Sequence, residues 1–139
     1  MMKKFTFLIV PFLVCFVLAS CQKTEPKPEC ILKDFPYEIH KVEKMKLYVA
    51  SEKYHHPDLD WSEEELYASD LLYITHFENE EGWWWTSWPI TNFPYEKGYE
   101  YLIEGLRIHY FYQGDMILTT FQCCKILSKQ KKQSENLPQ

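Results

Sequence analysis

The chain has 139 residues, of which 15 are Lys or Arg and 20 are Asp or Glu, so its formal net charge is −5. This acidic balance argues against nucleic-acid binding, which needs a basic surface to neutralise phosphates. Aromatic residues make up 17% and charged residues 25% of the chain, a composition unlike that of a disordered or collagen-like protein. About 119 residues follow the expected leader, enough for one domain and too few for a second core.

Residues 1–20 have the order of a secretory signal peptide, with Lys3 and Lys4 ahead of an apolar run and small residues behind it. The apolar run, Phe5–Leu18, has 14 residues and contains Pro11. A bilayer span takes about 17 to 25 residues. The segment is therefore predicted to direct export and not to remain as a membrane span.

The end of this leader, Leu18-Ala19-Ser20-Cys21, resembles the lipobox of bacterial lipoproteins. The resemblance implies that Cys21 carries a diacylglyceryl thioether and, after cleavage, an acylated amino group, with palmitate as a typical chain. Two or more acyl chains hold a protein stably on a membrane. The alternative is that Cys21 is an ordinary buried cysteine behind a signal peptide.

Residues 21–40 are predicted to comprise the lipidated cysteine and a tether. Residues 22–25, Gln-Lys-Thr-Glu, resemble the surface-export signal of lipoproteins in one group of Gram-negative bacteria, and Gln22 differs from the Asp that resembles an inner-membrane retention signal. The expected address is the outer membrane, with its outer face as a further expectation. Pro26 and Pro28 favour an extended chain of about 3.1 Å per residue, which holds the domain roughly 25 Å from the bilayer.

A β domain is predicted over residues 41–129, followed by a polar tail at 130–139 that shows no core signal. Apolar residues alternate in Lys41–Ala50, which predicts a half-buried strand whose lysines suit a sheet edge. A short helix is predicted from Ser62 to Asp70, because Ser62 and a Glu three residues later form a capping box.

Further strands are predicted by runs of aliphatic and aromatic residues that end at turn residues. They are Leu71–Phe77, Trp83–Ser87, Tyr99–Tyr112 and Met116–Leu127. A tight turn at residues 113–116 joins the last two, since Gly114 tolerates a positive φ. Short connections favour antiparallel pairing. The predicted fold class is mainly β, a small antiparallel sheet or partly open barrel with one short helix.

Four stretches of this domain resemble domain-of-unknown-function family 4377. They are Lys46–Ala50, Trp83 followed at seven residues by Ile90, Phe93–Tyr101, and Lys125–Lys129. The resemblance spans about Val42 to Lys129 and implies a small β-rich unit without assigned activity, found in bacterial lipoproteins and beside META-type domains. It supplies no catalytic residues.

This chain departs from the family at two places. The family commonly carries a cysteine pair around the first inter-strand loop, where this chain has His55, His56 and then Leu71 and Leu72. Asn92 also stands where the family usually has Gly before the Phe. The first loop is therefore expected to be rebuilt around the helix at Ser62.

Three cysteines, Cys30, Cys123 and Cys124, remain once Cys15 leaves with the leader and Cys21 is acylated. In an exported protein, a disulfide from Cys30 to Cys123 or Cys124 would tie the end of the tether to the last strand, and the odd number of cysteines leaves one outside this bond. Neighbouring strand residues point to opposite faces, so at most one of the adjacent pair suits this bond. The adjacent spacing also disfavours a metal site.

No metal or other cofactor is predicted. The stretch His55-His56-Pro57-Asp58-Leu59-Asp60 has ligand types but neither the spacing of a helical zinc pair nor that of a calcium loop, and is interpreted as a solvated loop. His76 and His109 are interpreted as packed or exposed strand residues. No serine elbow or phosphate-binding glycine loop is present in the sequence, and the protein is predicted not to be an enzyme.

The tryptophans are the sharpest indication of function. Trp83, Trp84 and Trp85 cannot all face one core on a strand, because neighbours alternate between the two faces. An exposed indole surface suits stacking on sugars or anchoring a protein partner. The candidate binding surface comprises Trp83, Trp84, Trp85, Trp88, Tyr95 and Tyr99. The alternative is that these rings form core on one side and lie under the helix on the other.

Together these patterns predict a non-catalytic, outer-membrane-anchored lipoprotein that serves as a protein-interaction or envelope-accessory module. Its expected partners are the membrane, through the lipid anchor, and an envelope protein, with no nucleic acid. The alternative is a surface lipoprotein that binds glycans through exposed tryptophans. A third hypothesis, an inhibitor of proteases or host factors, rests only on the META-type domains that accompany the resembling family.

Overall fold

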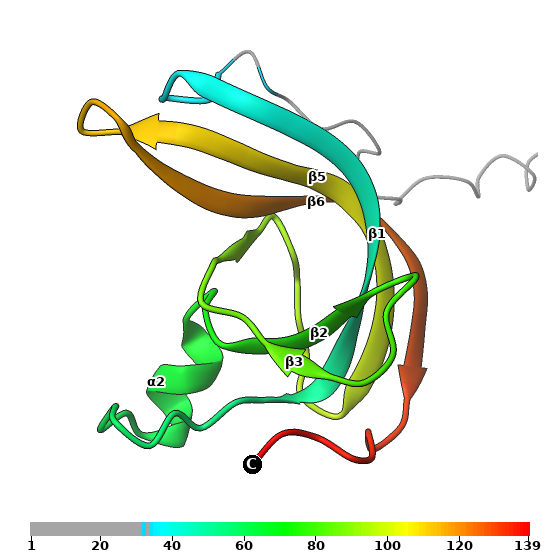
Figure 1. Cartoon of the computed structure of the whole chain (residues 1–139). Helices are drawn as coiled ribbons and strands as arrows, with labels where there is room; N and C mark the ends of the chain where they lie inside the picture. Colours follow the sequence, from blue (N-terminus) through cyan, green and yellow to red (C-terminus); the bar gives the residue numbers. More distant parts are fainter. Residues whose placement is uncertain (1–31, 33) are drawn as a thin grey trace, which may run out of the picture.

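Six strands form one sheet in a computed structural model that describes Leu32 and residues 34–139, with the order β3-β2-β1-β5-β6-β4 (Figure 1). The strands are β1 (Ile39–Lys53), β2 (Tyr73–Phe77), β3 (Trp84–Trp85), β4 (Ile90–Thr91), β5 (Tyr99–Tyr112) and β6 (Met116–Lys131). The described part has one helix, α2 (Glu63–Ala68). The predicted mainly β class with one short helix is confirmed. The sheet stays open, because β3 and β4 lie at its two edges.

Pairing is antiparallel between all neighbours except β4 and β6, which run parallel at Ile90 and Phe121. The predicted β5–β6 hairpin is present. Gln113 and Gly114 in its turn have φ angles of 52° and 95°, values that short hairpin turns use. The short strand β4 was not predicted from the sequence.

The three long strands bend together into a curved arm, and the smaller elements lie within its concave side (Figure 1). Register shifts accompany the bend, including one on β1 between Val49 and Lys53 and one between β5 and β6 near Gly105. Such bulges increase strand curvature. At Gly105 a Cβ atom would lie 2.1 Å from the Gln122 carbonyl oxygen, so this crossing requires glycine.

Alternate residues of the long strands face the concave side and build the core. Its buried members are Leu47, Val49, Tyr73, Ile90, Tyr101, Ile103, Phe121 and Cys123. Residues between them, such as Tyr48, face the opposite side of the sheet. This alternation is what the strand pattern of the sequence predicts.

The helix begins where the sequence predicts. Ser62 is the N-cap: its side chain accepts from the Glu65 amide at 3.1 Å, and the Glu65 carboxylate accepts from the Ser62 amide at 2.8 Å. The capping box is therefore confirmed. The helix ends at Ala68, before the predicted Asp70, because Ser69 adopts an extended conformation. Leu66 is its one buried residue.

The C-terminal residues are part of the fold, contrary to the prediction of a tail from residue 130 without core contacts. Strand β6 continues to Lys131. Beyond it, the amide of Ser134 donates to Ser51 Oγ and the Ser51 amide donates to Ser134 Oγ, each at 2.9 Å. Ser134 is only 6% exposed. This reciprocal pair ties the end of the chain to β1.

Candidate interaction surface

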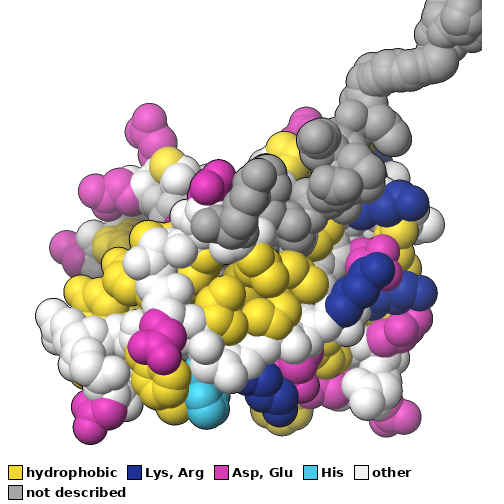
Figure 2. Space-filling view, turned by 90° about the horizontal axis from the view of Figure 1, so that it is seen from above, with side chains coloured by type: hydrophobic (Ala, Val, Ile, Leu, Met, Phe, Trp, Pro, Cys, Tyr) yellow, Lys and Arg dark blue, Asp and Glu magenta, His cyan; other side chains and the backbone are white. Residues whose placement is uncertain are grey.

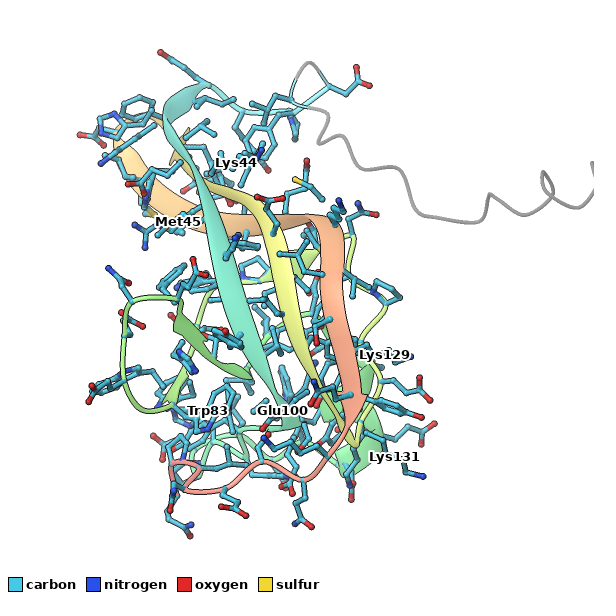
Figure 3. All side chains as sticks on the ribbon, turned by 90° about the vertical axis from the view of Figure 1, so that its right-hand side faces the viewer. Lys44, Met45, Trp83, Glu100, Lys129 and Lys131 are labelled. Atoms are coloured by element: carbon cyan, nitrogen blue, oxygen red, sulfur yellow. The ribbon has the colours of Figure 1, made fainter. Side chains whose placement is uncertain are left out.

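Strand β3 carries Trp84 and Trp85 at one edge of the sheet. Trp85 lies opposite Ile74 and Trp84 opposite Thr75 on β2. The turn ahead of β3 is closed by hydrogen bonds from the Phe77 amide to the Glu80 carboxylate and from the Glu80 amide to the Phe77 carbonyl, both 3.0 Å long. This hydrogen-bonded turn leads into the strand that carries the tryptophans at the sheet edge. Figure 3 shows Trp83 and Lys129 on opposite sides of the long strands.

Trp83 and Trp85 gather rings on the side of the sheet opposite the core. Trp85 stacks on Tyr54 with centroids 4.8 Å apart and planes 7° apart, and His56 meets it edge-on at 5.1 Å. Trp83 meets His76 at 4.7 Å, and His76 stacks on a further ring, Tyr48, at 4.7 Å. We call these six residues the outer aromatic surface: Tyr48, Tyr54, His56, His76, Trp83 and Trp85.

Trp84 points to the other side of β3 and is the most exposed large apolar side chain of the described residues, at 63%. Trp85 is 38% exposed. No ring of another described residue stacks on Trp84, whereas both of its neighbours contact rings. The prediction that the three successive tryptophans do not share one core is consistent with this arrangement.

Three other candidates lie against the core and do not join this surface. Trp88 stacks on Phe77 at 6.3 Å and on Phe121 at 6.2 Å. Tyr95 and Tyr99 are also partly buried against the core cluster. Burial raises the pKa of Tyr95 far above its ordinary value. The loop from β3 to β5 closes over the concave side of the sheet, which the sequence pattern does not reveal.

A buried lysine that the sequence pattern did not single out joins the helix to the core. Lys53 is 2% exposed, and its Nζ donates to the carbonyls of Leu66 at 3.0 Å and Ser69 at 2.5 Å. Its Nζ lies 4.2 Å from the Tyr73 ring centroid, a distance suited to a cation–π contact. Desolvation lowers the pKa of Lys53 to about 8, an effect that Asp70 opposes.

His109 belongs to a polar network across the arm. Its Nδ1 lies 2.9 Å from Thr119 Oγ1, and its Nε2 lies 3.6 Å from Glu43 Oε1. The same carboxylate oxygen accepts from Arg107 Nε at 2.9 Å and Nη2 at 2.8 Å, and this hydrogen bonding lowers the pKa of Glu43. The contacts of Glu43 with Arg107 are shorter than its contact with His109, so Arg107 is its main partner. The three residues and Thr119 form a cross-strand network.

The other histidine candidates lie around the tryptophans or in a loop. His76 Nδ1 is 2.9 Å from the Phe77 carbonyl, to which it donates. In the first loop His56 Nδ1 accepts from the Asp58 amide at 3.0 Å, while His55 and Asp60 are exposed. No group of three or more His, Cys, Asp or Glu side chains in the described part is placed to hold a metal ion.

The two adjacent cysteines differ in state. Cys124 is disulfide-bonded, and Cys123 is a free, buried thiol whose pKa burial raises to about 11. Only one of the pair is therefore in a disulfide, as the opposite faces of neighbouring strand residues require. Cys21 and Cys30, the predicted lipidation site and disulfide candidate, lie outside the described residues.

No helix among the residues that the structure describes is long and apolar enough to cross a membrane. Comparison with known proteins found no matching family model, no matching curated protein and no matching solved structure. The resemblance to domain-of-unknown-function family 4377 thus remains a prediction made from the sequence.

Proposed function

We propose that this protein is a lipid-anchored, non-catalytic binding module that docks onto an envelope protein through the end of the molecule that carries β3. The observation that carries the proposal is the exposure of Trp84 and Trp85, 63% and 38%, on an edge strand. Tryptophan, with tyrosine and arginine, is enriched among the residues that carry most of the binding energy of protein interfaces. Burying these rings would stabilise the folded protein, as the partial burial of Trp88 does. Their exposure therefore indicates a role other than stabilising the core.

The surroundings of β3 support a protein partner. The rings of the outer aromatic surface contact one another in two groups, one around Trp85 and one around His76, so that ordering them on binding costs little entropy. Exposed acidic residues, Glu78, Glu80 and Glu81, precede Trp83. They favour a partner whose contact surface has a basic rim. The unpaired outer side of β3 also offers backbone groups to an added strand.

Glycan binding is the second candidate, and Trp84 favours it. Its ring is open to solvent and unstacked in the described part of the chain. A single open indole suits the apolar face of a sugar ring. The protein hypothesis depends mainly on Trp85 and its ring neighbours, and the glycan hypothesis on Trp84.

The address is part of the same proposal. Acylation of Cys21 and export to the outer membrane follow from the resemblance of Leu18–Cys21 to a lipobox and of residues 22–25 to an export signal. Mass spectrometry of the matured protein tests the acylation, and the Cys21→Ser variant is expected to leave the membrane fraction. An unmodified thiol at Cys21 would overturn the anchor.

Binding is tested with the full chain in envelope pull-downs and on glycan arrays. For a protein partner, Trp85→Ala is expected to lower capture at least tenfold, because truncating a hot-spot tryptophan costs about 2 kcal/mol or more. For a glycan, Trp84→Ala removes the array signal. Leu127→Ala is the matched control, since Leu127 is 37% exposed on β6. Unchanged binding in both tryptophan variants contradicts the proposal.

A further inference from the structure

The β5–β6 hairpin ends in a second exposed apolar region, at the opposite end of the molecule from β3 and α2 (Figure 1). Met116 is 50% exposed, Ile117 46% and Tyr37, which lies beside the hairpin, 43%. Tyr37 stacks on Tyr110 with centroids 4.9 Å apart and meets Tyr112 edge-on at 5.6 Å. We call Tyr37, Tyr110, Phe111, Tyr112, Met116 and Ile117 the hairpin tip.

The tip is apolar on both faces of the sheet. Met116 pairs with Tyr112 and Ile117 with Phe111, and neighbouring residues on a strand point to opposite faces. The first face continues into Tyr37, and on the second Phe111 contacts His40 at 5.1 Å. A protein docked on one face would leave the apolar side chains of the other face in water. A lipid environment that surrounds the tip would remove the apolar side chains of both faces from water.

The described chain begins at this same tip. Phe35 lies edge-on to Tyr110 at 5.2 Å, and the Phe111 amide donates to the Glu38 carbonyl at 2.9 Å. Ten residues separate Cys21 from Leu32 in the sequence, and a chain of that length reaches at most about 35 Å. An acyl anchor on Cys21 therefore keeps the tip close to the bilayer. The length of the tether limits how far the tip can lie from the bilayer, but it does not prevent the tip from touching it.

The charged side chains around the tip indicate which kind of membrane surface it can contact. Asp34, Glu38 and Asp115 are exposed around it. Carboxylates disfavour an anionic membrane, to which basic segments are attracted, and tyrosines are enriched where lipid meets water. Figure 2 looks down on the upper side of the molecule and shows hydrophobic side chains on it, with acidic side chains at the left margin and both basic and acidic side chains at the right.

From these observations we infer that the hairpin tip rests in the interface of a zwitterionic phospholipid bilayer, with β3 directed away from the membrane. The inference depends on the proposed anchor for its strength, because the exposed apolar area is small and a nearby anchor raises its effective concentration. The orientation leaves both tryptophan faces of β3 accessible to a partner from outside.

Quenching by brominated phosphatidylcholine tests this arrangement in the full-length, lipidated protein reconstituted in vesicles. The native tryptophans, Trp61, Trp83, Trp84, Trp85 and Trp88, all lie outside the tip. Wild-type emission is therefore expected to be the same in brominated and ordinary vesicles. In Ile117→Trp or Met116→Trp the added emission is expected to fall by more than half on bromination.

Leu127→Trp is the matched control, an exposed apolar site ten residues further along β6, and its added emission is expected to stay within a tenth of the value in ordinary vesicles. Equal quenching at positions 117 and 127, or none at either tip position, would overturn the inference. Replacing a third of the lipid by phosphatidylglycerol is expected not to increase tip quenching, and an increase would contradict the assignment to a zwitterionic surface.

A separate arm distinguishes failure of the anchor from failure of the tip. The Cys21→Ser chain with an N-terminal hexahistidine is held on nickel-chelating vesicles, which replaces acylation by a synthetic tether. Quenching at position 117 in this arm supports the tip contact even when mass spectrometry finds no acyl chain on Cys21. Loss of quenching in both arms, with acylation present, overturns the tip contact and leaves the anchor proposal standing.

Discussion

The ammonium group of Lys53 lies 4.2 Å from the centroid of the Tyr73 ring while it donates to the carbonyl of Leu66 in α2 and to that of its C-cap, Ser69. One buried cation thus joins the helix, β1 and the aromatic part of the core. Its three protons find two carbonyl acceptors and a ring face, which is how a buried ammonium is tolerated without a carboxylate contact.

Replacing Lys53 by Ala is expected to destabilise the protein by about 2 to 4 kcal/mol, because the change leaves a cavity and removes partners from two helix-end carbonyls. Urea unfolding measures the effect. Lys46→Ala is the control on the same strand, since the Lys46 side chain is 41% exposed in a surface ion pair, and it is expected to cost less than about 0.5 kcal/mol. Equal losses in the two variants would show that Lys53 does not join helix and core.

The pH dependence of stability reports the same lysine. Its pKa is about 8 in the folded protein against an ordinary 10.5. Between these values the unfolded chain holds a proton that the folded chain has lost, so this group adds stability as pH rises. The gain is at most about 1.4 kcal/mol per pH unit.

Wild type and Lys53→Met are compared between pH 7 and 9.5. The unfolding free energy of the wild type, relative to Lys53→Met, is expected to rise with pH across the upper part of this range. Burial also raises the pKa of Tyr73 and Tyr95, but these tyrosines are present in both proteins and largely cancel in the difference. Parallel curves would contradict a lowered pKa at Lys53.

Features set by neighbouring residues were predictable from the sequence. The capping box at Ser62 depends on residues three apart, and the strand Tyr99–Tyr112 with its hairpin turn depends on local alternation and one glycine. The same alternation showed that Trp83, Trp84 and Trp85 cannot share a face. These are the parts of the fold in which chain-neighbour geometry decides the outcome.

Long-range features were missed for a physical reason. Lys53 lies beyond the predicted strand Lys41–Ala50, and its Nζ donates to the carbonyls of Leu66 and Ser69, 13 and 16 residues further along the chain. Ser134 becomes buried through a partner 83 residues away. The sequence predicted that Trp88, Tyr95 and Tyr99 extend the exposed tryptophans, but the segment after β3 and the start of β5 place them against the core. No local pattern encodes these contacts.

Ser134→Ala is expected to cost about 1 to 3 kcal/mol, because the buried Ser51 amide loses its acceptor and Glu100 loses a donor that lies 2.6 Å away. The change is also expected to speed proteolysis of the last residues. Ser87→Ala, at an exposed serine between β3 and β4, is the control and is expected to cost less than about 0.5 kcal/mol. If both serines tolerate alanine equally, the C-terminal residues do not stabilise the sheet.

Gly105→Ala tests the close crossing of β5 and β6. The added Cβ would lie 2.1 Å from the Gln122 carbonyl oxygen and 2.7 Å from Phe121 Cε1. A backbone atom held in the strand ladder yields poorly, so the expected loss is about 3 kcal/mol or more, or a failure to fold. Gly114→Ala is the comparison, because its added Cβ meets no atom within 4 Å but its φ of 95° is strained for alanine. That strain is expected to cost about 1 to 2 kcal/mol. Thermal unfolding measures the loss of stability in both variants. A larger loss in Gly114→Ala than in Gly105→Ala would mean that the close approach of β5 and β6 at Gly105 does not require glycine.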